Sequence, residues 1–379
     1  MPLRLLVIDS IPTPYNLSFF SAVARHPGVV ARIVLLAPSD SNRLWKVDPQ
    51  QHGLDYRILP SLHAYVESIE LPLYLHWGLW SELRRFQPDV IAIGGYHYLA
   101  TLEVLAFARI HHCGTVLWSG SHLLSGFLKR AWADAYKRWL ISRFDAYLSY
   151  GTAAREHLVH YDASGEKVIV GCNTVDVHCF KHRADGLRRT AVPDSPLRLL
   201  FVGRLVPIKN VGALIAAVGH LQGRGLDVTL TIVGDGPLRK ALQQHVDRKG
   251  VRGVIFTGFK NGDDLVETYV DAHALVLPSV NEIWGLVVNE AAACGIPSVV
   301  SVRAGAAQDL IREGETGFTF DPTVPGELEQ VLERLAADPQ LCRSMGKAAQ
   351  KFILTRDQTY YAERMLEAAE LALTVRRAG

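Results

Sequence analysis

The sequence Pro278-Ser-Val-Asn-Glu-Ile-Trp-Gly-Leu-Val-Val-Asn-Glu-Ala-Ala-Ala-Cys-Gly-Ile-Pro297 carries the clearest signs of how this chain folds. It follows a short apolar run, continues as a polar loop around Glu282, and becomes a mainly apolar segment that Gly295 and Pro297 bring to an end. The order of strand, loop and helix is typical of a parallel α/β sheet. Ligands of such sheets bind beyond the carboxyl ends of the strands, so this loop is a candidate binding site.

The beginning of the expected helix combines free amides with two carboxylates. The amides of Gly285, Leu286 and Val287 would point at a ligand, and they favour an anion. Glu282 and Glu290 are eight residues apart, about two helical turns, so we expect both carboxylates to face one pocket at different depths. Carboxylates repel phosphate but accept hydrogen bonds from sugar hydroxyls, which predicts contacts with a ribose and a second sugar. The alternative is an unliganded loop acid and helix-face acid, and the apolar neighbours of Glu290 argue against it.

A second motif, Phe201-Val-Gly-Arg-Leu-Val-Pro-Ile-Lys-Asn210, leaves another apolar run. We expect a turn at Gly203 and a helix that Asn210 caps. Arg204 and Lys209 would then lie at the carboxyl end of a strand beside a helix N-terminus, where a diphosphate would suit them. Taken alone, the motif also fits a solvated loop that happens to hold two basic residues.

Short apolar, β-branched runs alternate with segments of helical period along the whole chain, which predicts parallel sheets buried under helices on both faces. The expected helices include residues 16–25, 76–86, 99–112, 128–143 and 357–375. The expected strands are Leu3–Ile8, Val29–Leu36, Tyr56–Leu59, Val90–Ile93, Thr115–Trp118, Ala146–Ser149, Val168–Val170, Leu197–Val202, Val228–Val233, Val254–Thr257, Ala274–Leu277, Ser298–Ser301 and Gly317–Phe320.

The alternation stops once, in a polar and basic stretch with two prolines at residues 182–196. A chain of 379 residues is long enough for two domains. We therefore predict an N-terminal domain over residues 1–181, a linker over 182–196, a C-terminal domain over 197–355, and a helix over 356–379 that packs back on the N-terminal domain. The default ligand site would be the cleft between two such domains.

Composition excludes some function classes. The chain has 40 Lys and Arg against 38 Asp and Glu, a net charge of +2, which is too balanced for a dedicated nucleic-acid-binding protein. Five widely spaced cysteines without C-x-x-C indicate neither a disulfide framework nor a zinc site. Residues 1–9 are too short an apolar run for a signal peptide, and no run reaches the roughly 18 apolar residues of a membrane span. We therefore expect a cytosolic protein; the sequence does not indicate its oligomeric state.

Four motifs together resemble the carboxy-terminal half of the family 4 glycosyltransferases, which have the GT-B fold. They are the E-x-x-G-x-x-x-x-E spacing of Glu282–Glu290, the GRLVPIKN segment of Gly203–Asn210, Val233-Gly-Asp-Gly-Pro237 and Thr316-Gly-Phe-Thr-Phe320. The resemblance is dense from residue 197 to about residue 321. It implies two Rossmann-like α/β/α domains that face each other across a cleft. It also implies a nucleotide-diphosphate sugar donor bound mainly by the second domain, an acceptor bound mainly by the first, and retention of anomeric configuration. A UDP-sugar is favoured over a GDP-sugar.

The resemblance also assigns roles to individual residues. Arg204 and Lys209 would hold the diphosphate, Glu290 the ribose, and Glu282 the hydroxyls of the donor sugar. Phe259–Lys260 follows an expected strand and falls where the family borders the base. The sequence has no D-x-D, so we expect no metal and no cofactor besides the donor. The charge of the leaving group would be met by the two cations and the helix amides.

In the first half, Trp118-Ser-Gly-Ser-His122 follows an expected strand. The resemblance implies that His122 lies near the donor sugar and positions it or polarises a hydroxyl, whereas the alternative is a histidine without a catalytic role. The segment Ser10-Ile-Pro-Thr-Pro-Tyr-Asn16 stands where the family often has a glycine pair. Tyr15 and Asn16 in this stiff loop could contact the acceptor, which could be a glycan, a lipid-linked saccharide or a natural-product aglycone.

Residues 128–143 form a basic segment in which Trp132, Tyr136 and Trp139 share one helical face. One hypothesis is peripheral docking on the anionic inner face of a membrane. The alternative is a packed aromatic face with solvated Lys and Arg around it, and the sequence favours this second interpretation.

Other classes of protein also use paired α/β domains. A nicotinamide or flavin oxidoreductase is disfavoured because Val233–Arg239 has Arg where G-x-G-x-x-G requires its third Gly. A phosphorylase, a sugar-nucleotide epimerase of similar fold and a catalytically silent nucleotide-sugar-binding subunit stay open. The joint presence of Arg204, Lys209, Glu282 and Glu290 argues against a silent subunit.

Overall fold

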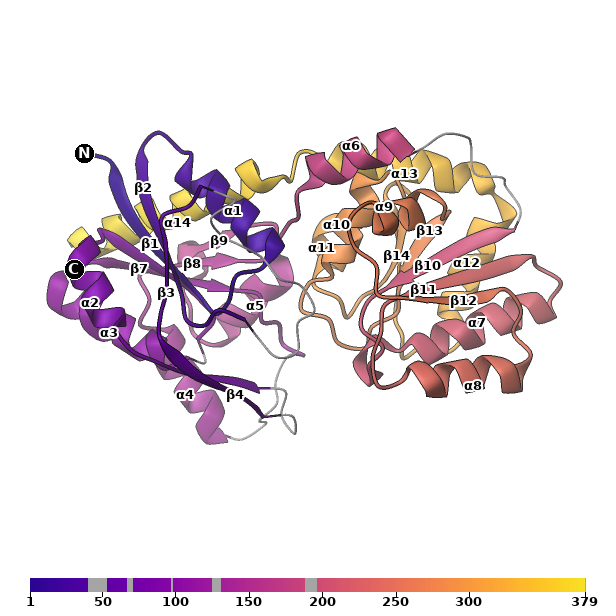
Figure 1. The fold of residues 1–379 in the computed structure, drawn as a ribbon, viewed down its shortest axis with the longest axis horizontal. Helices are drawn as coiled ribbons and strands as arrows, with labels where there is room; N and C mark the ends of the chain where they lie inside the picture. The colour runs from indigo at the N-terminus through magenta and orange to yellow at the C-terminus, as the bar shows by residue number, and fades with distance from the viewer. Residues whose placement is uncertain (40–52, 67–70, 97, 125–130, 188–195, 379) are drawn as a thin grey trace. The chain divides into compact units, whose positions relative to one another are not determined.

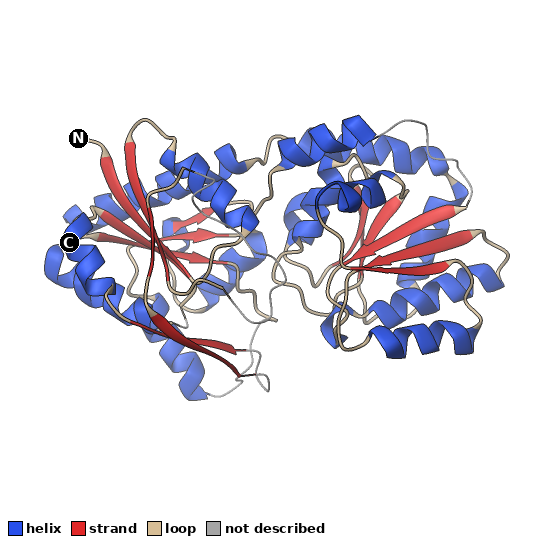
Figure 2. Cartoon of the chain, viewed as in Figure 1, coloured by secondary structure: helices blue, strands red, loops and turns tan. Residues whose placement is uncertain are grey.

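The computed structural model describes residues 1–39, 53–66, 71–96, 98–124, 131–187 and 196–378 (Figure 1). The chain divides into two compact units. Unit 1 comprises Met1–Val175 and Gln358–Gly379, and unit 2 comprises Asp176–Asp357. In both units helices cover a parallel sheet on its two faces (Figure 2), which confirms the predicted α/β class.

The sheet of unit 1 has seven parallel strands in the order β3-β2-β1-β6-β7-β8-β9. Its strands are β1 (Leu3–Asp9), β2 (Val29–Leu35), β3 (Tyr56–Ile58), β6 (Val90–Gly94), β7 (Gly114–Ser119), β8 (Ala146–Ser149) and β9 (Val168–Val170). Its helices are α1 (Pro14–Ala24), α2 (Leu79–Phe86), α3 (Leu99–His111), α4 (Ala131–Ile141), α5 (Thr152–His160) and α14 (Gln358–Ala378), and a short 3-10 turn spans Gly165–Lys167.

The C-terminal helix α14 lies along the sheet of unit 1 beside α1 (Figure 1). Trp118 on β7 donates through Nε1 to the Tyr361 hydroxyl of α14 over 2.6 Å. The ring of Phe19 lies 4.6 Å from that of Tyr361, centroid to centroid. A Cβ at Gly171 would come within 2.4 Å of the Tyr361 ring, so glycine lets the helix approach the sheet closely. The last helix therefore completes one side of the unit 1 core.

A small antiparallel hairpin of β4 (Ser61–Val66) and β5 (Leu71–His76) was not predicted. The helix expected from residue 76 begins instead at Leu79, because residues 71–76 are extended and Gly78 precedes the helix with φ +89°. That left-handed conformation favours glycine and ends the extended segment.

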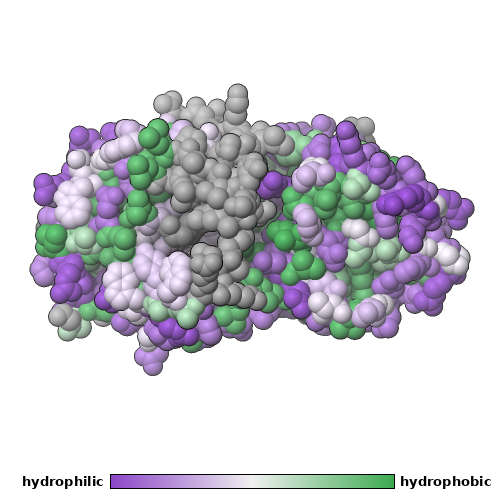
Figure 3. Space-filling view, turned by 90° about the horizontal axis from the view of Figure 1, so that it is seen from below, coloured by the Kyte–Doolittle hydropathy of each residue, from purple (hydrophilic) through white to green (hydrophobic). Residues whose placement is uncertain are grey.

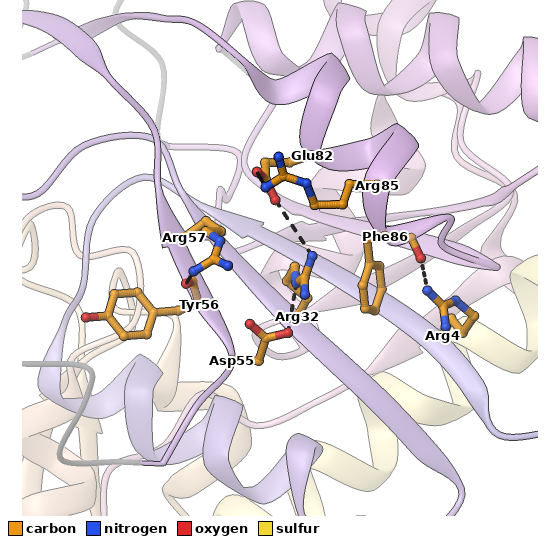
Figure 4. A network of polar contacts seen from close by, with 8 residues as sticks. All are labelled: Arg4, Arg32, Asp55, Tyr56, Arg57, Glu82, Arg85 and Phe86. Atoms are coloured by element: carbon orange, nitrogen blue, oxygen red, sulfur yellow. Dashed lines mark hydrogen bonds and ion pairs between the residues drawn. The ribbon is translucent and has the colours of Figure 1, made fainter.

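Arginine side chains fasten α2 to the strands beneath it (Figure 4). Arg32 pairs with Asp55 over 2.8 Å and with Glu82 of α2 over 3.7 Å. Arg4 donates to the backbone carbonyl of Phe86, and the guanidinium groups of Arg4 and Arg32 lie 4.8 and 4.9 Å from the centre of the Phe86 ring. Because the arginines also pack on the ring, their charges and their stems both hold the helix.

The sheet of unit 2 has six parallel strands in the order β12-β11-β10-β13-β14-β15. Its strands are β10 (Leu197–Val202), β11 (Val228–Val233), β12 (Val254–Gly258), β13 (Ala274–Leu277), β14 (Ser298–Ser301) and β15 (Gly317–Phe320). Its helices are α6 (Val177–Leu187), α7 (Val211–Gly223), α8 (Arg239–Lys249), α9 (Gly262–Val270), α10 (Leu286–Ala293), α11 (Ala306–Leu310), α12 (Glu327–Ala337) and α13 (Pro339–Ile353), and a short 3-10 turn spans Pro207–Lys209.

Every predicted strand is present within one residue of its expected bounds. Strand order reverses between β1 and β6 in unit 1 and between β10 and β13 in unit 2. Such switch points are where open α/β sheets bind ligands, because the loops there diverge to opposite faces.

The boundary between the units differs from the predicted linker at residues 182–196. Residues 182–187 complete α6, which packs on α9 and α10 inside unit 2, and Arg183 pairs with Asp263 over 3.5 Å. Asp176 accepts a hydrogen bond from the Cys179 amide over 2.9 Å and so supports the start of α6. Residues 188–195 of the expected linker lie outside the described residues.

All five cysteines are free thiols. Among the helices that the structure describes, none combines the length and apolar character needed to cross a bilayer.

Candidate functional site

Two loops meet at the switch point of unit 2. One follows β10 and contains the turn of Pro207–Lys209, and the other follows β13 and leads into α10. The Val280 amide donates to the Ile208 carbonyl over 2.9 Å, which joins the loops directly. The sequence motifs at residues 201–210 and 278–297 therefore form one site.

Lys209 and Glu282 form an ion pair between these loops, from Nζ to Oε2. The Ser279 hydroxyl lies 3.4 Å from the same carboxylate oxygen. Both charged side chains are mostly buried, with exposed fractions of 18% and 15%. In the absence of a ligand, each side chain neutralises the charge of the other. A ligand with phosphate and hydroxyl groups could bind the Lys209 ammonium through a phosphate and the Glu282 carboxylate through a hydroxyl.

The backbone around Glu282 is fixed on its other side by the loop after β14. The Glu282 amide donates to the Arg303 carbonyl over 3.2 Å, and the Gly305 amide donates to the Glu282 carbonyl over 3.0 Å. The Ala306 amide donates to the Trp284 carbonyl over 3.0 Å, and Trp284 is buried. The carboxylate is thus held on a rigid frame, as a preorganised site requires.

Arg204 is exposed, and among the described residues its guanidinium has no hydrogen-bond or ion-pair partner. Its loop packs against the loop after β11, where the Leu205 amide donates to the Asp235 carbonyl over 2.9 Å. A Cβ at Gly234, where φ is +128°, would lie 1.9 Å from the Gly203 carbonyl oxygen. The contact between Gly203 and Gly234 lets the two loops approach backbone to backbone, and it leaves the guanidinium of Arg204 available to an anion.

The start of α10 has no capping side chain. Gly285 precedes the helix with φ +100°, and a Cβ there would lie 2.7 Å from the Leu277 side chain. The amides of Leu286 and Val287 are in the first turn, where α10 offers no acceptor. No side chain caps this helix end, so these amides can bind a ligand.

Asn210 differs from its predicted role as a capping side chain. It immediately precedes α7 but has φ +53°, and its side chain makes no capping hydrogen bond. Asparagine tolerates this left-handed conformation, whereas a capping side chain requires an extended one.

Glu290 lies in α10, whereas Glu282 lies in the loop before it, and the two carboxyls have different partners. It accepts a hydrogen bond from the Tyr269 hydroxyl of α9 over 2.7 Å. Burial raises the pKa of Glu290 from 4.5 to about 7, although the Tyr269 hydrogen bond lowers it. Among the described residues, no hydrogen bond joins the two glutamates. The raised pKa moves the titration of the Glu290 carboxyl toward neutral pH, where its ionisation can respond to a ligand.

The two residues expected at the base lie beyond β12. Phe259 is 48% exposed, as a stacking surface for a base would be. Lys260 donates to the Thr268 hydroxyl over 3.0 Å, which holds its stem against α9.

In unit 1 the predicted His122 is buried after β7. Its Nδ1 accepts from the Leu124 amide over 3.2 Å. His157 of α5 is buried nearby, and its Nε2 lies 3.2 Å from the Tyr96 hydroxyl. Burial lowers the pKa of His157 to about 4, and the backbone of His122 interacts with its ring. His157 is therefore neutral near pH 7 and lies beside the His122 turn. Sequence reasoning missed it because α5 is distant in sequence.

The switch point of unit 1 holds a carboxyl group that sequence reasoning also missed. Asp9 ends β1, and its oxygens accept from the Ser10 amide over 2.7 Å and from Asn16 Nδ2 over 2.6 Å. Burial raises the pKa of Asp9 to about 6, against these hydrogen bonds. Asn16 is itself buried and is engaged by Asp9, whereas Tyr15 is partly exposed. The sequence signal was available, since Asp9 directly ends the first apolar strand.

Comparisons with known proteins agree with this geometry. Residues 31–178 match the family model described as Glycosyltransferase Family 4, and residues 185–352 match the one described as Glycosyl transferases group 1. A GDP-mannose-dependent alpha-mannosyltransferase from Mycolicibacterium smegmatis is 31% identical over 320 residues, which are 80% of this chain and 78% of that protein. The sulfoquinovosyl transferase SQD2 of Arabidopsis thaliana is 28% identical over 303 residues, or 76% of the chain. The chain spans about half the length of several such relatives, and 57% of SQD2.

Solved structures show the same fold. The structure of Anabaena HepE in complex with UDP superposes with a TM-score of 0.75 at 19% identity, covering 97% of this chain and all of the other. The sucrose-phosphate synthase of Thermosynechococcus elongatus gives a TM-score of 0.74 at 18% identity, with both chains fully covered. The fold is that of the GT-B glycosyltransferases. Within that class, the chain belongs to glycosyltransferase family 4.

Proposed function

We propose that this protein transfers a hexosyl or N-acetylhexosaminyl group from a nucleotide-diphosphate sugar to an acceptor hydroxyl, with retention of configuration. The observation that carries the proposal is the site at the switch point of unit 2. It joins Lys209, Glu282, the free guanidinium of Arg204 and the uncapped start of α10. A UDP-sugar is the favoured donor, and the Anabaena neighbour that binds UDP supports it. The GDP-mannose-dependent relative makes a GDP-sugar the alternative.

Each part of the site would hold one part of the donor. Arg204, Lys209 and the α10 amides would neutralise the diphosphate. Glu290 would accept hydrogen bonds from the ribose, and Glu282 from the donor sugar. Phe259 and Lys260 would border the base, and unit 1 would hold the acceptor near Tyr15.

The proposed reaction needs no protein base. The bond between the sugar and the phosphate lengthens while the cations and amides neutralise the leaving diphosphate. The acceptor hydroxyl attacks from the face that the diphosphate leaves, and it passes its proton to a departing phosphate oxygen. His122 would orient the donor sugar through its imidazole. We propose that the reaction is independent of metal ions, since two cations and a helix end already face the leaving group.

The variant Glu282→Ala separates catalysis from binding. Its contacts should count most in the oxocarbenium-like transition state, so transfer should fall far more than the affinity for UDP-glucose. Release of sugar from labelled donor and calorimetric binding would be measured on the same preparation. Equal losses in both would indicate a nucleotide-sugar-binding subunit without catalysis.

Metal independence has its own test. Transfer should survive an excess of EDTA, and its complete loss with recovery on added Mg²⁺ would overturn this part of the proposal. An epimerised nucleotide sugar, or a dependence of turnover on inorganic phosphate, would instead support an epimerase or a phosphorylase. Peripheral membrane contact is a separate hypothesis that does not follow from the donor site.

A further inference from the structure

The aromatic stripe of α4 faces water. Trp132, Tyr136 and Trp139 are 61%, 43% and 45% exposed, and the rings of Tyr136 and Trp139 stack with centroids 5.9 Å apart. The packed aromatic face that the sequence favoured is therefore wrong. Three large exposed aromatics on one helix face are unusual for a surface that only meets water.

The basic residues of α4 turn the other way. Lys137 lies 3.4 Å from the Tyr161 hydroxyl and 3.5 Å from Asp134, and Arg138 pairs with Asp162 over 2.8 Å. These contacts fasten the inner side of α4 to α5 and the turn that follows it. Together with the buried side chains of Ala133, Leu140 and Ile141 they occupy the other sides of the helix, so the aromatic side faces outward.

Helix α3 also exposes apolar side chains. Leu99, Leu102 and Ile110 are 53%, 37% and 62% exposed. A cavity of about 460 Å³ lies between the two helices; it is lined by Leu102, Leu105 and Arg109 of α3, Trp139 and Arg143 at α4, and Arg376 of α14, among others. Figure 3 shows green and pale side chains among purple ones on the face of unit 1 seen from below.

The cavity has a surplus of positive charge. Three arginines line it against one acid, Asp145, of which one carboxylate oxygen accepts from the Thr115 amide and hydroxyl over 2.9 and 2.8 Å. Arg376 donates to the Ala108 carbonyl over 2.8 Å, while its Nε is buried and finds no acceptor among the described residues. Arg109 has no acidic partner among them, and Arg143 lies 4.3 Å from the centre of the Trp139 ring. Guanidinium groups in this setting suit a phosphate.

From these contacts we propose that the face formed by α3 and α4 docks on an anionic bilayer, with a lipid phosphate in the cavity between Arg109, Arg143 and Arg376. The exposed aromatic rings would lie at the depth of the headgroups, where amphipathic rings are stable. Leu99, Leu102 and Ile110 would contact the acyl boundary. The choice of a bilayer rests on charge complementarity and on apolar and cationic groups that alternate on one face. The proposal is independent of the donor site.

Co-sedimentation with vesicles tests the surface. Vesicles of three parts phosphatidylcholine and one part phosphatidylglycerol should bind the protein, and vesicles of phosphatidylcholine alone should bind it much more weakly. The double variant Arg109→Ala/Arg143→Ala should lower partitioning by about 25-fold, at about fivefold for each cation near an anionic surface. The matched control Arg248→Ala/Lys249→Ala removes two exposed charges from α8 in unit 2 and should bind as the wild type does. Equal losses in both pairs, or no binding to the anionic vesicles, would overturn the proposal.

A second measurement reports the depth of the rings. Lipids brominated near the headgroup should quench part of the tryptophan fluorescence, and Trp132→Phe/Trp139→Phe should abolish that part of the quenching. Unchanged quenching in this variant would show that another face meets the membrane. Sedimentation velocity without lipid should give the same oligomeric state for the wild type and the arginine variant. If the wild type is a dimer and the arginine variant is a monomer, the face formed by α3 and α4 binds a second copy of the chain and not a bilayer. UDP-glucose should raise the melting temperature of all variants equally. A failure of the membrane proposal would therefore not affect the proposed donor site.

Discussion

The proposed contact between Glu290 and the donor ribose predicts that donor affinity depends on pH. In the free protein, burial raises the pKa of Glu290 to about 7, and Tyr269 is its hydrogen-bond donor. A ribose hydroxyl donates to the ionised carboxylate better than to the acid. Donor binding should therefore favour the ionised form, and affinity should rise with pH through about 7.

The size of the effect follows from the pKa. Raising it from 4.5 to about 7 costs the ionised form about 3 kcal/mol, at 1.36 kcal/mol for each pH unit. Between these values the folded state of Glu290 binds more protons than the unfolded state. Its contribution to stability is therefore present at low pH and is lost as pH rises to about 7. Donor affinity should move in the opposite direction, with a gain of about tenfold between about pH 6 and about pH 8.

Calorimetric titration with UDP-glucose across this pH range measures the effect, because the diphosphate of a nucleotide sugar does not titrate there. In Glu290→Gln the dependence should disappear. In Tyr269→Phe the midpoint of the pH dependence should move to higher pH. The hydrogen bond from Tyr269 lowers the pKa of Glu290, so its removal raises that pKa. Asp9→Asn is the matched control: Asp9 is a second buried carboxyl with a raised pKa, but it lies in unit 1. Parallel profiles in the wild type and Glu290→Gln would refute the ribose contact.

Two further variants test how the site is supported. Gly234→Ala should destabilise the protein by about 3 kcal/mol or more, because its Cβ would lie 1.9 Å from the Gly203 carbonyl at φ +128°. Gly212→Ala on α7 is the control, because its Cβ would meet only an ordinary contact; its free energy of unfolding should rise by up to about 1 kcal/mol. Thermal unfolding measures both variants, and equal effects on stability would contradict the close packing of the two loops. His157→Ala should lower kcat by about tenfold and leave donor affinity unchanged, if it positions His122. A loss confined to the melting temperature would make His157 purely structural.

Most strands were predictable because they are short apolar runs buried inside a sheet, whereas the edge strands β3 and β12 are partly exposed. Val90–Gly94 is almost entirely apolar and lies in the middle of its sheet. A short, continuous apolar run of this kind is typical of a parallel strand that is covered on both faces. The same argument explains the failure at α6. Residues 177–187 are polar on average, so their helical character is evident only once α9 and α10 supply a surface to pack on.

The candidate site was predictable as a set of loops and not as a set of contacts. Lys209 and Glu282 follow strands β10 and β13, and adjacent parallel strands bring their carboxyl ends together. The partner of Glu290 could not be inferred in this way. Tyr269 comes from α9, on which no motif was recognised, and the pKa of Glu290 depends on how completely packing removes water from it.

Helix α4 shows why periodicity alone does not assign a surface. Spacing places Trp132, Tyr136 and Trp139 on one side of the helix, but a stripe of aromatics is equally compatible with a core and with an interface. The rotation of α4 is set by tertiary packing: Ala133, Leu140 and Ile141 are buried, and Lys137 and Arg138 make polar contacts with Tyr161 and Asp162. With these sides of the helix occupied, the aromatic side faces outward. The basic residues of a helix therefore do not identify its exposed face by themselves, because acidic partners such as Asp162 can hold them on another side of the helix.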